Sequence, residues 1–421
     1  MKKESQFLTE DKKRGYMMIS FKGLKILDLT RLLPGGYATQ FFAEYGAEII
    51  KVEDTEKGDY LRDLGPSFAS SPEFSCYFSA TNYSKQSIAL NLKTEEGRQI
   101  FYRLAETADV IVESFRPGTV ERLKIDYSAV KAINPTIIYC SISAFGQTGN
   151  RAKMPGHDIN FLSLSGFLDV NGSQPESKPA IPGTQIADIG SGVSATLGIV
   201  SALYQRQLTG EGQYIDISMF DVISTWMLNP YLDYLSTGRV SNRGRELLNG
   251  GVLCYHIYET VDHRYLAFGA VEDKFWQQIC DILEMPELRE EAFSVANTSN
   301  RNYVLLQNKI KAKTLAEWNA IFDTADCCVT PVLNTEEVMK ENHFRDRNIV
   351  EYISLNNLSS HAVPKIRLPI KFGSAHESLN AVKGEFASPP KQGDHSVEIL
   401  KKANYTEQEI NHLLDKGIIK N

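Results

Sequence analysis

The clearest structural signal lies over residues 24–53, where apolar runs alternate with a stretch of helical spacing. Residues 24–29 (LKILDL) are a compact apolar run typical of a buried strand, and residues 48–53 (EIIKVE) predict a second strand. Between them, residues 31–36 (RLLPGG) predict a turn, and residues 38–47 (ATQFFAEYGA) are spaced as in a helix. A strand, a helix and a strand in this order predict parallel strands joined by a right-handed crossover.

The alternation continues through the first half of the chain. Residues 94–108 (TEEGRQIFYRLAETA) predict an amphipathic helix, and residues 108–115 (ADVIVESF) and 136–146 (TIIYCSISAFG) predict strands. Repeated strand–helix units are typical of α/β proteins, so we expect a large Rossmann-like domain with a doubly wound parallel sheet. Residues 216–235 (DISMFDVISTWMLNPYLDYL) predict one helix.

The pattern changes after residue 235. Residues 255–271 alternate between apolar and polar positions around a turn at Asp262-His263, which predicts an antiparallel hairpin. Helical spacing follows over 275–283 and 315–325, and residues 328–333 predict a strand. These elements indicate a smaller α+β domain.

The expected domains follow from these changes in pattern. We expect a polar tail over 1–20, the large domain over 21–224, the small domain over 225–335 and a C-terminal segment over 336–421. The last segment contains Pro-rich stretches and ends in an amphipathic helix, and such extended segments usually wrap over another surface.

Composition and charge exclude several classes of partner. The 421 residues are 42% hydrophobic, and the formal net charge of -7 argues against nucleic acid, which would require a basic face. Residues 1–20 lack the apolar core of a secretory signal, and the six cysteines form no CxxC pair. The longest apolar run, 192–204, is too short to span a bilayer. We therefore expect a cytoplasmic protein with reduced thiols and no membrane partner.

Familiar cofactor and metal motifs are not found in the sequence. The turn LLPGGYATQ lacks GxGxxG, and Pro34 removes a backbone donor that a pyrophosphate would use, although Glu53 stands where a ribose-binding acid would stand. The glycines of this turn are better explained by a tight turn. The eight histidines show no HExxH, and there is no GxSxG, so neither a metal nor a redox cofactor is expected.

A local cluster of basic residues offers a site for an anion. Three of its members lie within residues 115–124 (FRPGTVERLK), which follow a predicted strand, and open α/β sheets bind ligands at that position. A solvated charged face is the alternative, and the sequence leaves both open. The cluster comprises Lys93, Arg98, Arg116, Arg122 and Lys124, with Lys153 further along.

Four titratable residues are candidates for chemistry. His157 and Asp158 precede a small apolar run, Asp188 lies in the small-residue segment ADIGSG, and Glu272 follows the predicted hairpin. A lone carboxylate among small residues is costly to bury unless it is hydrogen-bonded or used. The alternatives are a helix N-cap for Asp188 and a packed core histidine for His157.

Eight short stretches stand in the order and spacing of a known family pattern: GLKILDLTRLLPGG, AEYGAEIIKVE, LNLKTEEGR, VIVESFRPG, SISAFGQTG, PGHDINFLSLSG, ADIGSG and RQLTGEGQYIDISMFD. Together they resemble the superfamily of class III CoA-transferases and α-methylacyl-CoA racemases. The resemblance runs from about Phe21 to the C-terminal helix, and the order and spacing of the motifs carry it. It implies a Rossmann-like domain that binds coenzyme A, a small domain, a C-terminal segment that returns to the large domain, and two chains interlocked as a homodimer.

The same resemblance gives the basic cluster a ligand, the nucleotide part of an acyl-CoA substrate. By match to the family pattern, the residues that line it are Leu32, Leu90, Lys93, Phe115 and Arg122. Lysine and arginine would neutralise the phosphates, and the apolar side chains would flank the adenine. Relatives often carry an arginine just after the second strand, where this chain has Asp54, so the packing around adenine must differ.

Two reactions share this scaffold. In the racemases, the residues similar to His157 and Asp188 exchange the α-proton on opposite faces of the substrate, and the residues similar to Glu272 and Asp158 support them. In the transferases, the residue matching Asp188 forms an anhydride and then an aspartyl-CoA thioester. A CoA-thioester-binding homologue without activity is a third alternative.

Two further features bear on this choice. The loop ELLNGGVLCYH has only Gly250 and Gly251, not the longer glycine run common in transferases, which favours a racemase of 2-methyl-branched acyl-CoA thioesters. Thr184 stands where racemases often have asparagine, which favours the CoA-transferase.

Overall fold

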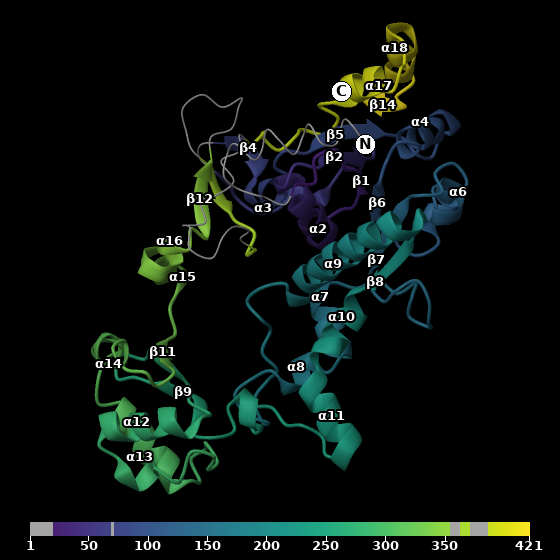
Figure 1. The fold of residues 1–421 in the computed structure, drawn as a ribbon. Coiled ribbons are helices and arrows are strands. Elements are labelled where there is room, and N and C mark those ends of the chain that lie inside the picture. Colours follow the sequence, from purple (N-terminus) through teal and green to yellow (C-terminus); the bar gives the residue numbers. More distant parts are fainter. Residues whose placement is uncertain (1–19, 69–70, 354–362, 371–385) are drawn as a thin grey trace. The chain divides into compact units, whose positions relative to one another are not determined.

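The computed structural model describes residues 20–68, 71–353, 363–370 and 386–421 (Figure 1). The chain forms two compact units, each with its own core. The first comprises the residues up to Asp158, Gln185–Val222 and Arg347–Asn421, and the second comprises Ile159–Thr184 and Ile223–Asp346. Residues 159–184, which the sequence pattern placed within the large domain, thus group with the second unit.

A seven-stranded sheet organises the first unit, in the order β14-β5-β2-β1-β6-β7-β8. Neighbouring strands are parallel except β14, which pairs antiparallel with β5. Apart from β14, this is the strand order of the Rossmann fold, and it confirms the predicted α/β architecture. The strands are β1 (Lys25–Leu29), β2 (Glu48–Glu53), β5 (Gln86–Leu90), β6 (Val110–Glu113), β7 (Ile138–Ser143), β8 (Tyr214–Ser218) and β14 (Ile419–Lys420).

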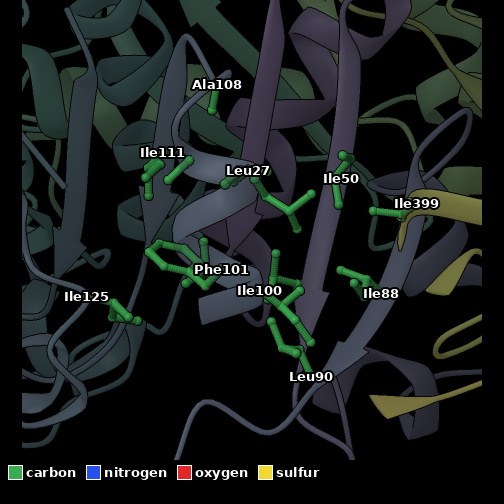
Figure 2. Packing of buried hydrophobic residues seen from close by; sticks show 14 of the residues in the cluster. Leu27, Ile50, Ile88, Leu90, Ile100, Phe101, Ala108, Ile111, Ile125 and Ile399 are labelled. Carbon is green, nitrogen blue, oxygen red and sulfur yellow. The ribbon is translucent and has the colours of Figure 1, made fainter. Parts of the chain in front are cut away.

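One face of the sheet packs against helices from both ends of the sequence. Leu27, Ile111 and Tyr139 point to this face, because they are paired in register on the neighbouring strands β1, β6 and β7 and belong to one buried cluster. Phe101 and Ile399 belong to the same buried cluster, part of which is shown in Figure 2. The helices are α4 (Glu95–Ala105), α5 (Thr119–Leu123), α6 (Tyr127–Lys131), α17 (Ser396–Lys402) and α18 (Glu407–Asp415).

The opposite face is covered by α2 (Leu33–Glu44) and α9 (Ile186–Thr209), which pack on each other. A Cβ atom at Gly192 would lie 2.7 Å from the carbonyl oxygen of Pro34, so the contact between the helices requires glycine there. Among the described residues, α9 is the one helix whose length and apolar composition would suit a bilayer. Its buried residues pack against the sheet, and helices in protein cores share this length and composition.

The second unit contains the predicted antiparallel hairpin. Strands β9 (Tyr255–Glu259), β10 (Tyr265–Gly269) and β11 (Val329–Pro331) form a three-stranded sheet in the order β11-β10-β9. The hairpin turn includes His263 with φ 57°, and the prediction of a turn there is confirmed. The main helices of this core are α12 (Asp273–Leu283), α13 (Arg301–Ile310) and α14 (Leu315–Phe322).

Two local predictions were wrong. Residues 216–235 are not one helix: they include most of β8, then α10 (Met219–Trp226) and most of α11 (Leu228–Thr237). Pairing of β8 with β7 overrides helical spacing at the start. Pro230 has no backbone N–H to donate, which is tolerated in the first turn of a helix, and it lies in the first turn of α11. The glycines of RLLPGG lie inside α2, and the residue with positive φ in this segment is Leu32, at 63°.

The remaining elements are short. In the first unit they are η2 (Tyr60–Asp63), β3 (Ser67–Phe68), β4 (Ser71–Ser75), α3 (Cys76–Ala80), β12 (Val350–Ile353) and β13 (Val363–Ile366). In the second they are α8 (Phe167–Val170), η3 (Leu247–Asn249), η4 (Pro286–Leu288), α15 (Thr335–Lys340) and α16 (Asn342–Asp346). Helix α7 (Asp158–Leu164) begins at the last residue of the first unit's opening segment.

Candidate active site

The point where the strand order of the sheet reverses lies between β1 and β6. In open parallel sheets, ligands bind outside the carboxyl ends of the strands at such a point. Arg31 and Leu32 follow β1 there, and Ser114 and Phe115 follow β6. The Arg31 N–H donates to Ser114 Oγ at 3.0 Å, which joins the two turns.

The turn after β1 is held in an unusual conformation by a buried carboxylate. Leu32 has φ 63° and ψ -160°, a region that a leucine rarely adopts and that costs about 1–3 kcal/mol. Its N–H donates to Asp59 Oδ1 at 3.0 Å, and Leu61 donates to the same atom at 3.0 Å. The other oxygen of Asp59 pairs with Lys51 Nζ at 2.8 Å, and both side chains are fully buried.

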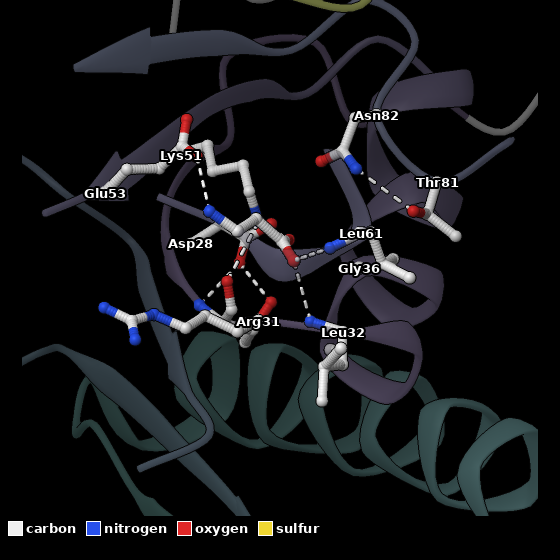
Figure 3. Close-up of polar contacts among 12 residues, drawn as sticks. Asp28, Arg31, Leu32, Gly36, Lys51, Glu53, Leu61, Thr81 and Asn82 are labelled. Atoms are coloured by element: carbon white, nitrogen blue, oxygen red, sulfur yellow. Dashed lines mark hydrogen bonds and ion pairs between the residues drawn. The ribbon is translucent and has the colours of Figure 1, made fainter. Parts of the chain in front are cut away.

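A second buried ion pair continues this network through Asp28, which Figure 3 shows together with Lys51 and Leu32. Lys85 Nζ lies 3.0 Å from Asp28 Oδ2, and Thr39 Oγ1 donates to the same oxygen at 2.6 Å. Burial opposes the charge on Asp28, but Lys51 and Lys85 outweigh it and lower its pKa. Burial lowers the pKa of Lys85 to about 8. Removing one partner would leave a buried charge unpaired, so these pairs fix the geometry of the turn.

The predicted nucleotide-binding residues differ in how they are placed. Phe115 and Leu32 are half-buried in the two turns, whereas Lys93 and Arg122 are exposed. Lys93 Nζ lies 3.5 Å from Glu56 Oε1. Leu90 is 1% exposed and packs in the hydrophobic core of the sheet. The structure thus groups Leu32 and Phe115 at the strand reversal, with Leu90 buried and the two cations at the surface.

Glu53 does not have the free carboxylate that a ribose would need. Its oxygens accept hydrogen bonds from Arg62, from the Asp59 N–H and from Ser87 Oγ, and the residue is 5% exposed. This agrees with the missing GxGxxG.

Asp188 lies in the first turn of α9 and is half-buried. Burial and, to a smaller extent, the nearby charge of Asp158 together raise the pKa of its carboxyl to about 7. A carboxyl group with such a pKa is close to half-ionised at neutral pH, which suits a group that both takes and gives protons.

Asp158 provides the cap of that helix, although it lies about thirty positions earlier in the sequence. Its Oδ1 accepts hydrogen bonds from the Ala187 N–H at 2.7 Å and from the Asp188 N–H at 3.2 Å. Gln185, the residue at the N-cap position, makes no such bond with its side chain. Asp188 is therefore not the cap of the helix, and Asp158 both positions Asp188 and supports its raised pKa.

His157 and Glu272 are both exposed. His157 directly precedes Asp158 and the start of α7. It is therefore not the packed core histidine that was the alternative. Glu272 stands immediately before α12 with an extended backbone, and its side chain makes no cap bond. The structure therefore brings Asp158 and Asp188 together, with His157 as a chain neighbour, and places Glu272 in the second unit.

The turn with Gly250 and Gly251 is fixed within the second unit. Gly250 has φ 103°, and its carbonyl oxygen lies 2.6 Å from Nδ1 of His256. Burial lowers the pKa of His256, which favours the neutral ring with a proton on Nδ1. Within the described ranges, His, Cys, Asp and Glu side chains form no cluster of three that could hold a metal ion.

Arg31, Asp59 and Tyr60 contribute to this region and were not predicted from the sequence. Arg31 forms an ion pair with Asp54, the position where the family pattern often has arginine. The acidic Asp54, at a position where relatives often carry an arginine, was the one signal in the sequence that pointed to Arg31. The role of Asp59 depends on a folded loop that no local pattern indicates.

The charge on Asp158 should set the pH dependence of any reaction that uses Asp188 as a base. Asp158→Asn keeps an oxygen that can accept both helix N–H bonds but removes the negative charge. We expect the pKa of Asp188 to fall, because a nearby negative charge disfavours its ionised form. The acidic limb of the kcat/KM profile should therefore move to lower pH.

Asp169→Asn is a matched control, because Asp169 is an exposed carboxylate paired with Arg243 at 3.7 Å in the second unit. It should leave the profile in place. A profile for Asp158→Asn identical to that of the wild type would show that the charge does not act on Asp188.

Comparison with known proteins identifies the family. The model of CoA-transferase family III matches residues 21–396. Alpha-methylacyl-CoA racemase from Mus musculus is 32% identical over 94% of this chain and 97% of its own length. Succinate--glutarate CoA-transferase from Agrobacterium fabrum is 31% identical over 90% of this chain and 94% of its own. A CAIB/BAIF family protein from Brucella suis, of known crystal structure, is similar with a TM-score of 0.77 and 30% identity over 92% of this chain and 100% of that chain.

The chain belongs to CoA-transferase family III. This confirms the family resemblance seen in the sequence motifs. The relatives include a racemase and a CoA-transferase at nearly the same identity, so the family is one of enzymes and both reactions considered above stand.

Proposed function

We propose that this protein is a racemase or epimerase of 2-methyl-branched acyl-CoA thioesters, acting in the cytoplasm without a metal or redox cofactor. The carboxylate of Asp188 removes the α-proton from one face, and the C–H electron pair passes into the thioester as an enolate. The protonated ring of His157 then returns a proton to the opposite face. Exchange with water restores both groups.

The observation that carries this proposal is the environment of Asp188. Its pKa is raised to about 7, and its backbone is fixed by Asp158 at the start of α9. A base tuned close to neutral pH is matched to proton transfer between carbon and oxygen. The N-terminus of α9 adds a positive potential where negative charge would develop on the enolate oxygen.

The other predicted residues keep roles that follow from the resemblance. Leu32, Lys93, Phe115 and Arg122 contact the nucleotide of the acyl-CoA, and Leu90 supports this site from the buried core. Glu272 of the partner subunit supports His157. Lys93 and Arg122 are exposed cations, which suits contact with phosphate.

A CoA-transferase is the second candidate. It would form an aspartyl-CoA thioester on Asp188 and move CoA between two carboxylic acids. The name of the Agrobacterium fabrum relative, at 31% identity, favours it. A half-buried carboxylate with a raised pKa is also a stronger nucleophile once ionised.

The test is hydrogen exchange with solvent. A single epimer of a 2-methylacyl-CoA incubated with the enzyme in D2O should gain deuterium at the α-carbon and become a mixture of epimers. No exchange with short, branched or steroid-like acyl-CoA substrates would rule out the racemase. An adduct on Asp188 trapped by hydroxylamine would then support the transferase, and binding of CoA with neither reaction would support a homologue without activity.

We further propose that the partner of this chain is a second copy, as in the interlocked homodimer implied by the resemblance. An apolar stripe follows the side of α9 turned away from its buried residues. Val193, Leu197, Tyr204 and Leu208 on this stripe are 50%, 68%, 65% and 65% exposed. Exposed apolar stripes of this length usually mark an interface. Light scattering of the purified chain should give the mass of a dimer.

A further inference from the structure

Arg31 presents a planar cation at the strand reversal of the sheet. Its Cζ lies 5.2 Å from the centre of the Tyr60 ring and 6.0 Å from that of Phe115. Nη1 donates to the Tyr60 hydroxyl at 3.1 Å, and Nη2 pairs with Asp54. The side chain is 29% exposed, so the guanidinium is held at its edges and remains open to a ligand in part.

Asp54 holds this cation from an ordered loop. Its Oδ1 accepts hydrogen bonds from the N–H groups of Glu56 and Lys57, each at 2.8 Å, and of Gly58 at 3.2 Å. Gln392 donates to the Asp54 carbonyl oxygen at 2.6 Å and ties the loop to the C-terminal segment. Arg31 is thus positioned before any ligand arrives, which reduces the entropy lost on binding.

We propose that the guanidinium of Arg31 stacks on the adenine of the bound coenzyme A, with the Phe115 ring beside it. This assignment rests on the proposed use of an acyl-CoA. A guanidinium stacks on flat aromatic groups, and the strand reversal between β1 and β6 is where such a nucleotide would lie. Relatives often carry an arginine at the position of Asp54, and Arg31 then supplies the planar cation that this chain lacks there.

The contacts favour stacking over binding of a phosphate. One N–H of Nη2 already donates to Asp54 and one N–H of Nη1 donates to the Tyr60 hydroxyl, so two of the five guanidinium donors are engaged before a phosphate could bind. The carboxylate beside the guanidinium also repels a phosphate. The flat face of the guanidinium carries no such bond.

Calorimetric titration with three ligands tests the assignment. The ligands are CoA, 3′-dephospho-CoA and 4′-phosphopantetheine, which lacks adenine. Arg31→Gln and Arg31→Lys should both lower the affinity for CoA and for 3′-dephospho-CoA by about five- to thirtyfold, the range of a desolvated cation–π contact. The affinity for 4′-phosphopantetheine should not change. Lysine keeps a positive charge that can pair with Asp54 but lacks the planar guanidinium group. Arg103→Gln is the control, because Arg103 lies over the Tyr405 ring at 4.7 Å on α4, and it should bind all three ligands as the wild type does.

Three other results of the titrations would overturn the assignment. A loss confined to CoA would make Arg31 a ligand of the 3′-phosphate, and an equal loss for all three ligands would make its role structural. Wild-type affinity in Arg31→Lys would make the charge alone sufficient. If the wild type does not bind CoA, the proposed function fails along with the assignment. If it binds CoA but exchanges no α-proton, only the proposed reaction fails, and the titrations still decide the role of Arg31. Thermal unfolding checks that each variant is folded.

Discussion

Asp188→Asn is expected to lower kcat by about 10³-fold or more in both the racemase and the transferase reaction. Asparagine has nearly the same shape and keeps the backbone N–H that donates to Asp158, but it can neither accept the α-proton nor attack a thioester. The measurement is single-turnover exchange or transfer with the variant. A variant with more than a tenth of the wild-type rate would remove Asp188 from the chemistry.

The same variant should be more stable than the wild type at high pH. The pKa of Asp188 is about 7 in the folded protein, above its ordinary value of 3.8. Protonation therefore stabilises the folded state, and this contribution is lost as the pH rises from about 4 through 7. We expect Tm of Asp188→Asn to exceed that of the wild type at pH 8, with the difference vanishing near pH 4. An equal difference at both pH values would contradict the burial of the charge.

His157→Gln is expected to separate the two reactions. A racemase needs one proton-transfer group on each face, so epimerisation should fall by about 10²–10⁴-fold. The epimer whose α-proton faces Asp188 should still gain deuterium, with retention of configuration, whereas the other epimer should be inert. A transferase that works through Asp188 should keep most of its rate.

The measurement is deuterium incorporation and epimer ratio for each pure epimer. His263→Gln is a suitable control, because His263 is an exposed histidine in the hairpin turn of the second unit, paired with Glu259. Equal exchange of both epimers by His157→Gln would show that another group works on the second face.

The sheet of the first unit was predictable because its strands are short apolar runs with distinct turns. Residues 48–53, predicted as a strand, are β2 itself. The prediction was wrong over residues 216–235, where pairing with β7 determines the structure of the first three residues. Spacing within one segment contains no information about such a distant partner.

The candidate site, like the fold, was predictable only in part. Asp188, His157 and the nucleotide-binding residues were assigned by resemblance, since a lone acid or histidine has several equally good structural explanations. That Asp158 caps α9 could not be predicted, because the cap comes from a residue far away in the sequence. The position of Arg31 depends in the same way on a loop around Asp54.

The discontinuous first unit has a consequence for synthesis of the protein. Strands β1 to β8 leave the ribosome well before α17, α18 and β14, which complete one face and one edge of their sheet. The core of residues 223–346 is translated in between. Domains fold as units during translation, so the inserted unit can reach its native packing while the sheet of the first unit still exposes Ile88 and Leu90 along β5. The nascent chain therefore carries an unpaired apolar strand edge, and its yield should depend on chaperones that cover that edge until β14 is made.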